Sequence, residues 1–545
     1  MIRRPSRSSA SPLALVTILA VAALPLRAQD APAAAPEARM AADLDLIEAD
    51  GPQPVFVRMR DQLLPDADAW DRFVAAHATT PRRELRPTIR ADLQTRAAAS
   101  WDAIAATVRE LQDAGHVGAE LERFWIVNGF ATTADADAVR RLAAHDAVGY
   151  VHRQRQPGRL DQHEFRSLPE AARARGERAL ESLLGMRSDG EPAFDPDAVA
   201  VPWNLQRIRA PEAWHTGAVG QGVTIAMIDS GLLPIEPVAR ALWQDPREEP
   251  NGTDDDGDGF VDERCGWDAI GDTPFAVGDG PKSHGTMCAG ILVGRESGED
   301  RFTTGVAPRA RLMVLRGGGR LRAYEFLASH EADVLSMSFM WIGFDLGSYR
   351  SVLRTAHEHL AACGVVAVGG AGNFGRSAPE GRQIAFPKDI PCVIAAAGVV
   401  ESGEVPPFSS RGPVTWDLAP WYADHPAGHP LEKPDVSGCI GGFPVWHRLE
   451  MPGRGVEVFR KLDGGFGLIV GPRGNSFSGP HAGGVAALML SAAPDLNVWD
   501  VQRLMRETCT DLLDDGWDPT SGAGLLQADA AVAAARALAT SRRDG

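Results

Sequence analysis

Four residues in the second half of the sequence carry side chains that could together perform nucleophilic catalysis. Ser476 lies in a glycine-rich turn, GNSFSG, ahead of a run of small apolar residues. Asp229 follows the apolar segment VTIAMI, His284 begins HGTMCAGILVG, and Asn373 follows VVAVGGAG. A carboxylate can orient an imidazole, the imidazole can take a proton from a hydroxyl, and an amide can donate to a developing oxyanion.

Each of the four residues also has a simpler interpretation when it is taken alone. Ser476 could be the N-cap of a buried helix, and Asn373 could be there because it tolerates a left-handed turn. Asp229 could be an acidic turn residue, and His284 a capping or surface histidine. The catalytic hypothesis therefore depends on all four occurring together, at the ends of strands and the starts of helices.

The elements that must position these residues are visible as near-continuous apolar runs beyond residue 200. Such runs are typical of strands that are buried on both faces, and they predict a mostly parallel sheet flanked by helices, an α/β fold. Functional side chains gather at the carboxyl ends of the strands in such sheets. The runs that we assign to strands are residues 222–229, 310–315, 332–339, 364–372 and 392–399.

The order Asp, His, Asn, Ser, with these flanking residues, resembles that of the subtilisin-like serine peptidases (subtilases). The similarity covers residues 200–535, and the order itself is a known feature of that family. Further segments that are similar to family signatures are WNLQRIRAPEAW (203–214), GVAPRARLMVLR (305–316), PFSSRGP (407–413), KPDVSG (433–438) and SGAGLLQADAAV (521–532).

The resemblance implies a serine endopeptidase of polypeptide substrates with a catalytic triad. Ser476 would attack the peptide carbonyl, His284 would act as base and then acid, and Asp229 would orient His284. The Asn373 side chain and the Ser476 backbone N–H would hold the oxyanion. The substrate would bind as an extended strand, and the resemblance implies that Gly317, Gly318, Gly319, Ser336, Ser338 and Met340 would contact it.

Two departures from the family pattern concern the site. Asn475, Phe477 and Ser478 replace the usual neighbours of the nucleophile, and none of these changes removes a catalytic group. Met340 stands where the family commonly has a glycine that leaves room for substrate. Met340 could crowd the first specificity pocket, so the alternative hypothesis is a catalytically weak, subtilase-like protein that binds peptides.

The rest of the chain predicts an exported zymogen. Arg3, Arg4 and Arg7 precede a short apolar run, so residues 1–28 are expected to be a cleaved signal peptide and the protein to be secreted or periplasmic. Residues 29–154 combine a flexible leader with a small α/β unit that resembles the inhibitory propeptide of the family, an intramolecular partner. Residues 155–199 are expected to be a linker with one exposed helix, and residues 200–545 the catalytic domain.

The net charge and an acidic loop bear on the partners and metal ions of the protein. The formal net charge of −17 argues against nucleic acid or an anionic membrane surface as the main partner. Asp254, Asp256 and Asp258 occupy alternate positions, Gly259 comes next and Asp262 follows later. Their oxygen ligands could converge on a structural calcium ion, the alternative being a solvated acidic turn. No cofactor is expected for the chemistry, and the six cysteines predict no particular disulfide.

Overall fold

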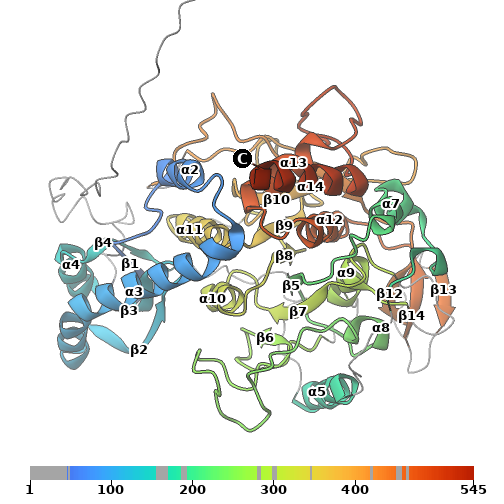
Figure 1. Cartoon of the computed structure of the whole chain (residues 1–545). Coiled ribbons are helices and arrows are strands. Elements are labelled where there is room, and N and C mark those ends of the chain that lie inside the picture. The colour runs from blue at the N-terminus through green and yellow to red at the C-terminus, as the bar shows by residue number, and fades with distance from the viewer. Residues whose placement is uncertain are drawn as a thin grey trace, which may run out of the picture.

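The computed structural model describes residues 46, 50–154, 170–185, 193–278, 284–296, 304–343, 346–417, 421–449, 457–461 and 466–544. A small N-terminal domain, blue in Figure 1, packs beside a larger α/β domain that runs from green to red. None of the described helices is long and apolar enough to cross a membrane.

The small domain is an antiparallel sheet of four strands covered by helices. The strand order is β2-β3-β1-β4, and α4, which the Asp135 side chain caps, packs with α3 against one face. That face has a core of its own, which includes Val57, Ile104, Phe130 and Leu142. The elements are β1 (Gln53–Met59), α2 (Ala67–Ala76), α3 (Arg82–Asp113), β2 (Val117–Phe124), β3 (Gly129–Ala134), α4 (Ala136–Ala144) and β4 (Val148–Arg153).

The segment RFWIVNGFATT contains the end of β2 and most of β3. The chain turns at residues 125–128, between β2 and β3, and Asn128 adopts a positive φ of 37° there. The N–H groups of Trp125 and Ile126 point out of the small domain and donate to Glu325 of the large domain. The turn is therefore stabilised by a residue that is remote in sequence. The apolar pattern of the segment itself could not predict the turn.

The linker contains a helix, but it is not free in solvent. Helix α5 (Glu170–Gly185) buries Leu180 and Leu184 in the core of the large domain and packs near α8. Gly176 lies against the side chain of Val277, where a Cβ atom would clash. The helix at residues 170–185 is thus docked on the large domain.

The large domain is built on a seven-stranded sheet, which confirms the expected α/β architecture. All of its strand pairs are parallel, in the order β11-β10-β9-β8-β5-β7-β6. Each of the five apolar runs forms one strand at the centre of this sheet. The strands are β5 (Thr224–Ile228), β6 (Gly266–Asp268), β7 (Arg311–Arg316), β8 (Val334–Met337), β9 (Val366–Gly370), β10 (Val393–Val399) and β11 (Val436–Cys439).

Helices enclose the sheet, and α12 crosses the strands that carry the site. The glycines of α12 allow a close approach to the sheet, since a Cβ atom at Gly479 would lie 2.6 Å from the Gly370 nitrogen. The helices are α6 (Trp203–Arg207), α7 (Ala210–His215), α8 (Glu236–Ala239), α9 (His284–Val293), α10 (Leu321–Ser329), α11 (Tyr349–Ala362), α12 (Ser478–Ala492), α13 (Val498–Glu507) and α14 (Ala528–Asp544), with a short 3-10 turn at Pro196–Ala198.

A second, small sheet precedes α12 and was not predicted from the sequence. It consists of β12 (Val445–Arg448), β13 (Glu457–Lys461) and β14 (Phe466–Val470), paired antiparallel in the order β12-β14-β13. Trp446 of β12 packs against Gly290 of α9. The sheet therefore braces the helix that His284 begins.

Candidate active site

Asp229 and His284 form the centre of the site. Asp229 follows β5 directly and is 3% exposed, and His284 is the first residue of α9. The distance between His284 Nδ1 and Asp229 Oδ1 is 2.8 Å. Because a carboxylate oxygen accepts, Nδ1 carries the proton, and Nε2 of the neutral ring is free to act as a base.

The pair is electrostatically coupled. Burial alone would raise the pKa of Asp229, but the charge of His284 and the hydrogen bond with it outweigh burial and lower that pKa. Burial alone would lower the pKa of His284, but Asp229 outweighs it and raises that pKa well above its ordinary value. The Ser230 N–H also donates to Asp229 Oδ1 at 2.7 Å, which fixes the carboxylate.

Ser476 lies in the turn before α12, close to His284. The thiol of Cys288, one helical turn beyond His284, is 3.9 Å from His284 Nδ1 and donates to the Ser476 carbonyl at 3.5 Å. The Ser338 hydroxyl donates to the same carbonyl at 2.7 Å. Ser476 is half-buried, and its carbonyl accepts hydrogen bonds from two different elements.

Asn373 approaches the same turn from the end of β9. Its side-chain oxygen accepts the Asn475 N–H at 2.8 Å, and its amide nitrogen lies beside Gly474. This hydrogen bond fixes the orientation of the Asn373 amide, with Oδ1 toward Asn475. Its Nδ2 group therefore remains available as a donor. Asn475 is buried and donates to the Gly372 carbonyl and the Ser409 hydroxyl, which ties the two turns together.

The other residues expected to contact substrate, besides Ser338, lie in different surroundings. Gly318 and Gly319 lie against the rings of Phe339 and Trp341, so the segments that carry them touch. Met340 reaches the turn that carries Asn373, because its Sδ and Cε would be 3.1 and 3.0 Å from a Cβ atom at Gly372. Gly317 has a φ of 107° and lies near Ala269, whereas Ser336 is in the interior of β8 and faces α12.

Lys388 is a further charged group beside the site, and sequence reasoning missed it. Its side chain is fully buried, and its Nζ donates to the carbonyl of Phe339, whose ring lies 5.0 Å away. Burial lowers the pKa of Lys388 to about 7, against the opposing charges of Asp229 and Asp389. The local sequence FPKDIP offers no signal for this, because it gives no hint that the lysine points inward.

The acidic loop contains two adjoining groups of potential metal ligands. Asp254 and Asp256 lie with Glu248, while Asp256 also lies near Asp245, Glu263 and His330. Both Asp262 carboxylate oxygens accept N–H groups of residues 251–252, so Asp262 is turned away from the other expected ligands. Of the four aspartates expected around calcium, Asp254 and Asp256 meet with Glu248 in an all-oxygen set that fits calcium.

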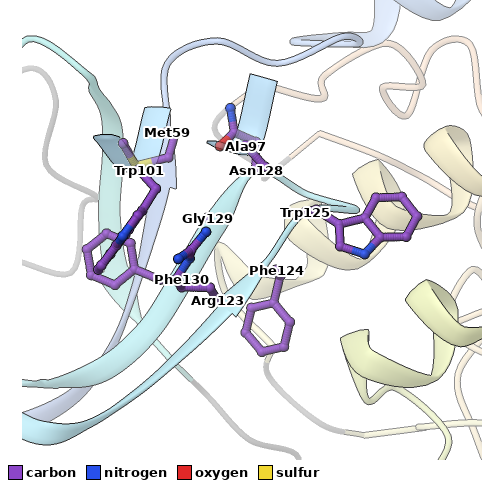
Figure 2. A pocket seen from close by; sticks show the side chains of 9 residues that line it. All are labelled: Met59, Ala97, Trp101, Arg123, Phe124, Trp125, Asn128, Gly129 and Phe130. Atoms are coloured by element: carbon purple, nitrogen blue, oxygen red, sulfur yellow. The ribbon is translucent and has the colours of Figure 1, made fainter. Parts of the chain in front are cut away.

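Two cavities lie at or within the small domain. One of about 330 Å³ is lined only by residues of the small domain, among them Trp101, Arg123 and Phe130 (Figure 2). Another, of about 540 Å³, lies where the domains meet and is lined by Gln154 as well as by Gly318 and Gly319. The second cavity places the end of β4 beside the segment expected to bind substrate.

All six cysteines are free thiols. Cys265, Cys288, Cys363, Cys392 and Cys439 are buried, as expected for small apolar core residues. Burial raises the pKa of these thiols, to about 12 for Cys265 and Cys363.

Comparison with known proteins gives a consistent result. The model of the subtilase family, peptidase S8, matches residues 220–524. A probable subtilase-type serine protease of Deinococcus radiodurans is 28% identical over 59% of this chain and 42% of its own length. Fervidolysin of Fervidobacterium pennivorans is 25% identical over 61% of this chain and 43% of its own. Subtilisin E of Bacillus subtilis is 26% identical over 75% and 82% respectively.

The aligned region thus spans less than half the length of the first two relatives. The family match covers more than half of this chain and includes Asp229, His284, Asn373 and Ser476. Together with the parallel sheet that carries these residues, it identifies the large domain, and the chain belongs to the subtilase family.

Proposed function

We propose that the protein is a serine endopeptidase that hydrolyses peptide bonds through Ser476, His284 and Asp229. The observation that carries the proposal is the 2.8 Å contact between His284 Nδ1 and Asp229 Oδ1 in the interior, with the Ser476 turn next to it across Cys288. Family membership supports the same activity.

In the proposed mechanism His284 Nε2 removes the proton of Ser476 Oγ as the oxygen attacks the peptide carbonyl. Asp229 stabilises the imidazolium that forms, and the proton then passes to the leaving amine, which leaves an acyl-enzyme for water to hydrolyse. The Asn373 amide and the Ser476 N–H would stabilise the oxyanion, and a donor of this kind is worth about 10²–10³ in rate.

The test of the nucleophile is labelling with a serine-directed fluorophosphonate. The processed wild-type protein is expected to be labelled at Ser476, and the Ser476→Ala variant is expected to remain unlabelled. A folded, processed wild type that takes up no label would refute the endopeptidase proposal. Ser478→Ala is the matched control, because Ser478 is two residues away but buried and bonded to the Ala396 carbonyl.

We further propose that the small domain is an inhibitory propeptide within residues 29–154. Two observations support this proposal. Arg82 and Arg86 of the small domain make buried ion pairs with Asp333 of the large domain. Gln154 lines the same cavity as Gly318 and Gly319. The chain that follows Gln154 therefore starts next to the substrate-binding segment. Cleavage is expected within residues 155–199, and the amino-terminal sequence of the active protein tests this.

Export by a signal peptide at residues 1–28 is part of the same proposal, although these residues lie outside the described structure. The test is the amino-terminal sequence of the protein recovered from periplasm and medium. Recovery of the chain only from the cytoplasm, with residues 1–28 intact, would contradict it.

A catalytically weak, peptide-binding protein is the second candidate, and it is favoured by one observation. Met340 packs on Gly372, where a large side chain of the substrate would be expected to bind. In this case, fluorophosphonate would label Ser476 slowly, and peptides would bind to the processed protein without being cleaved.

Structural calcium in the acidic loop is proposed on the group of Glu248, Asp254 and Asp256. Calcium would supply positive charge among these carboxylates and would take no part in the chemistry. EGTA is expected to lower the melting temperature, and Asp254→Asn is expected to remove that sensitivity. A melting temperature indifferent to EGTA would count against the site.

A further inference from the structure

A buried histidine faces carboxylates beneath the acidic loop. His330 caps the end of α10, and its side chain is 0% exposed, as are those of Asp245 and Glu263. His330 Nε2 lies 3.1 Å from Asp258 Oδ2, 3.2 Å from Glu263 Oε1 and 3.5 Å from Asp245 Oδ2. The donor atoms of Asp245, Asp256, Glu263 and His330 all lie within 4.8 Å of one another, and these four residues are called the His330 cluster here.

The other nitrogen of His330 fixes the tautomer. Nδ1 is 2.8 Å from the carbonyl of Phe326, which can only accept, so Nδ1 carries a proton. In the neutral ring the Nε2 lone pair then points at three carboxylates, which is repulsive unless a cation lies between them. A bond from Nδ1–H to a backbone carbonyl is also the usual support of a histidine that binds metal through its other nitrogen.

Protonation of His330 would not satisfy the cluster. An imidazolium offers one N–H at Nε2, and only Glu263 Oε1 accepts it in good geometry. Glu263 Oε2 and Asp258 Oδ2 are buried and have no hydrogen-bond partner among the described residues. The completely buried Glu263 therefore keeps one unsatisfied oxygen, which is costly in an apolar interior.

The charge balance also requires a cation. Asp245, Asp256, Asp258 and Glu263 carry four negative charges, and Arg247 compensates one of them through Asp245 and Asp256. A protonated His330 would still leave two negative charges, whereas a divalent ion bound to the neutral ring leaves one. The rings of Phe326, Trp243 and Phe260 surround His330 and exclude water, which strengthens the attraction.

The spacing and the chemistry of the donors select the ion. Donors about 2.0–2.2 Å from one metal lie roughly 3.0–3.5 Å from each other. The distances from His330 Nε2 to Glu263 Oε1 and Asp245 Oδ2, 3.2 and 3.5 Å, lie in this range. Calcium prefers oxygen ligands, whereas an imidazole with carboxylates suits zinc and other first-row transition ions. We propose that Asp245, Asp256, Glu263 and His330 bind one divalent transition cation of the zinc type, beside the calcium proposed with Glu248 and Asp254.

The ion would hold together elements that are distant in sequence. Glu263 precedes β6, His330 ends α10, and Asp245 follows the segment that pairs with β7. Helix α10 begins two residues after Gly319, so the cluster anchors the far end of the helix that follows the substrate-binding segment. The bound metal would be structural and would not contact substrate.

The test uses the full chain carrying Ser476→Ala, which prevents autolysis, after removal of metals with dipicolinate. Calorimetric titration with Zn²⁺ in the presence of excess Ca²⁺ is expected to show a site that His330→Gln removes, so that the stoichiometry falls by one. Zn²⁺ is expected to raise the melting temperature by about 3–5 °C in the parent chain and not in the variant.

A matched control separates metal binding from the loss of a buried histidine. His357 is equally buried, and its Nδ1 likewise lies 2.8 Å from a carbonyl four residues back, but no carboxylate is paired with its Nε2. His357→Gln should leave the zinc stoichiometry unchanged, and Asp254→Asn should too. Absence of zinc binding, or binding that His330→Gln does not change, would show that the cluster is an ion pair only and would overturn the proposal.

Discussion

At the residue scale, the properties of the site depend on how burial and charge act on single side chains. In the proposed mechanism His284 must be neutral to accept the proton of Ser476, yet Asp229 stabilises its charged form. The pKa of His284 is accordingly raised well above its ordinary value, in spite of burial. If the proposed roles hold, the interaction with Asp229 shifts the active pH range upward.

The first prediction concerns that pH range. Because the pKa of His284 is raised, the catalytically competent neutral ring is lost at a higher pH than in a free imidazole, as the solution is acidified. The acid limb of kcat/KM, measured on a peptide substrate with the processed enzyme, is expected to have its midpoint above 6.5. A midpoint below 6.5, or activity that stays constant down to pH 4, would contradict the role of His284 as base.

The second prediction concerns Met340. Its sulfur and methyl group lie against Gly372, so Met340→Gly should open space for a large P1 side chain. With substrates that carry Phe or Leu at P1, kcat/KM is expected to rise by about 10-fold or more. Differences of this size are typical when a hydrophobic pocket gains room for a larger side chain. Substrates with Ala at P1 are the internal control and should change little. An equal gain for all substrates would mean that Met340 does not limit the pocket.

At the element scale, the two domains are joined by both apolar packing and buried charge. Phe56 of β1 belongs to the core of the large domain, while its neighbours Val55 and Val57 belong to the core of the small one. Arg82 Nη1 and Arg86 Nη2 of helix α3 lie 2.7 and 2.9 Å from Asp333 Oδ1. Asp333 also accepts the Thr224 N–H at the start of β5. The small domain thus reaches the base of the sheet that carries Asp229.

The third prediction compares two adjacent arginines of α3. Arg82 is paired with Asp333 in the interior, whereas Arg83 is paired with Asp495 at the surface, where the side chains are 66% and 46% exposed. Arg82→Met in the Ser476→Ala chain should lower the free energy of unfolding by about 1.5–3 kcal/mol, because Asp333 loses one buried charge-assisted hydrogen bond while Arg86 remains paired with it. Arg83→Met should cost less than about 1 kcal/mol. Urea denaturation measures both, and equal losses would argue against the buried anchor.

The same elements show what the sequence could predict. Strands β5, β7, β8, β9 and β10 were predictable because their apolar runs are buried on both faces. The turn at residues 125–128 was not, because Glu325 of another domain supports it. The placement of Lys388 and the approach of His330 to the acidic loop also depend on packing between distant segments, which residue spacing cannot report. The roles of the triad residues remain predictions.

At the scale of the whole molecule, the interface between the domains contains histidines that burial and hydrogen bonding keep neutral. His359 of α11 accepts the Leu64 N–H at Nε2, 3.2 Å away, and donates from Nδ1 to the Ile126 carbonyl at 2.6 Å. His152 of β4 stacks with Phe56 at the same interface. Burial lowers the pKa of both histidines to about 4. A proton on Nε2 of His359 would face an N–H donor, so the docked state excludes it.

The fourth prediction follows from that exclusion. A group whose pKa is depressed in the docked state stabilises that state above pH 6.5, and the stabilisation is lost as the pH falls from 6.5 toward 4. The contribution lost by pH 5 is roughly 1–2 kcal/mol for each histidine. In the full Ser476→Ala chain, the free energy of unfolding in urea, followed by tryptophan fluorescence, should therefore be lower at pH 5.0 than at pH 7.5.

Two variants make this pH dependence specific to the interface. His359→Gln can keep both hydrogen bonds, as acceptor for Leu64 and donor to Ile126, without titrating. Because burial also lowers the pKa of His152, His357 and His481 to about 4, the difference between pH 7.5 and pH 5.0 should shrink by about a quarter. His429→Gln, at an exposed position, should leave the difference intact. If the two variants show the same difference, acid acts elsewhere, and the interface histidines do not control docking. If only His359→Gln reduces it, mild acid loosens the small domain from the surface beside the substrate-binding segment.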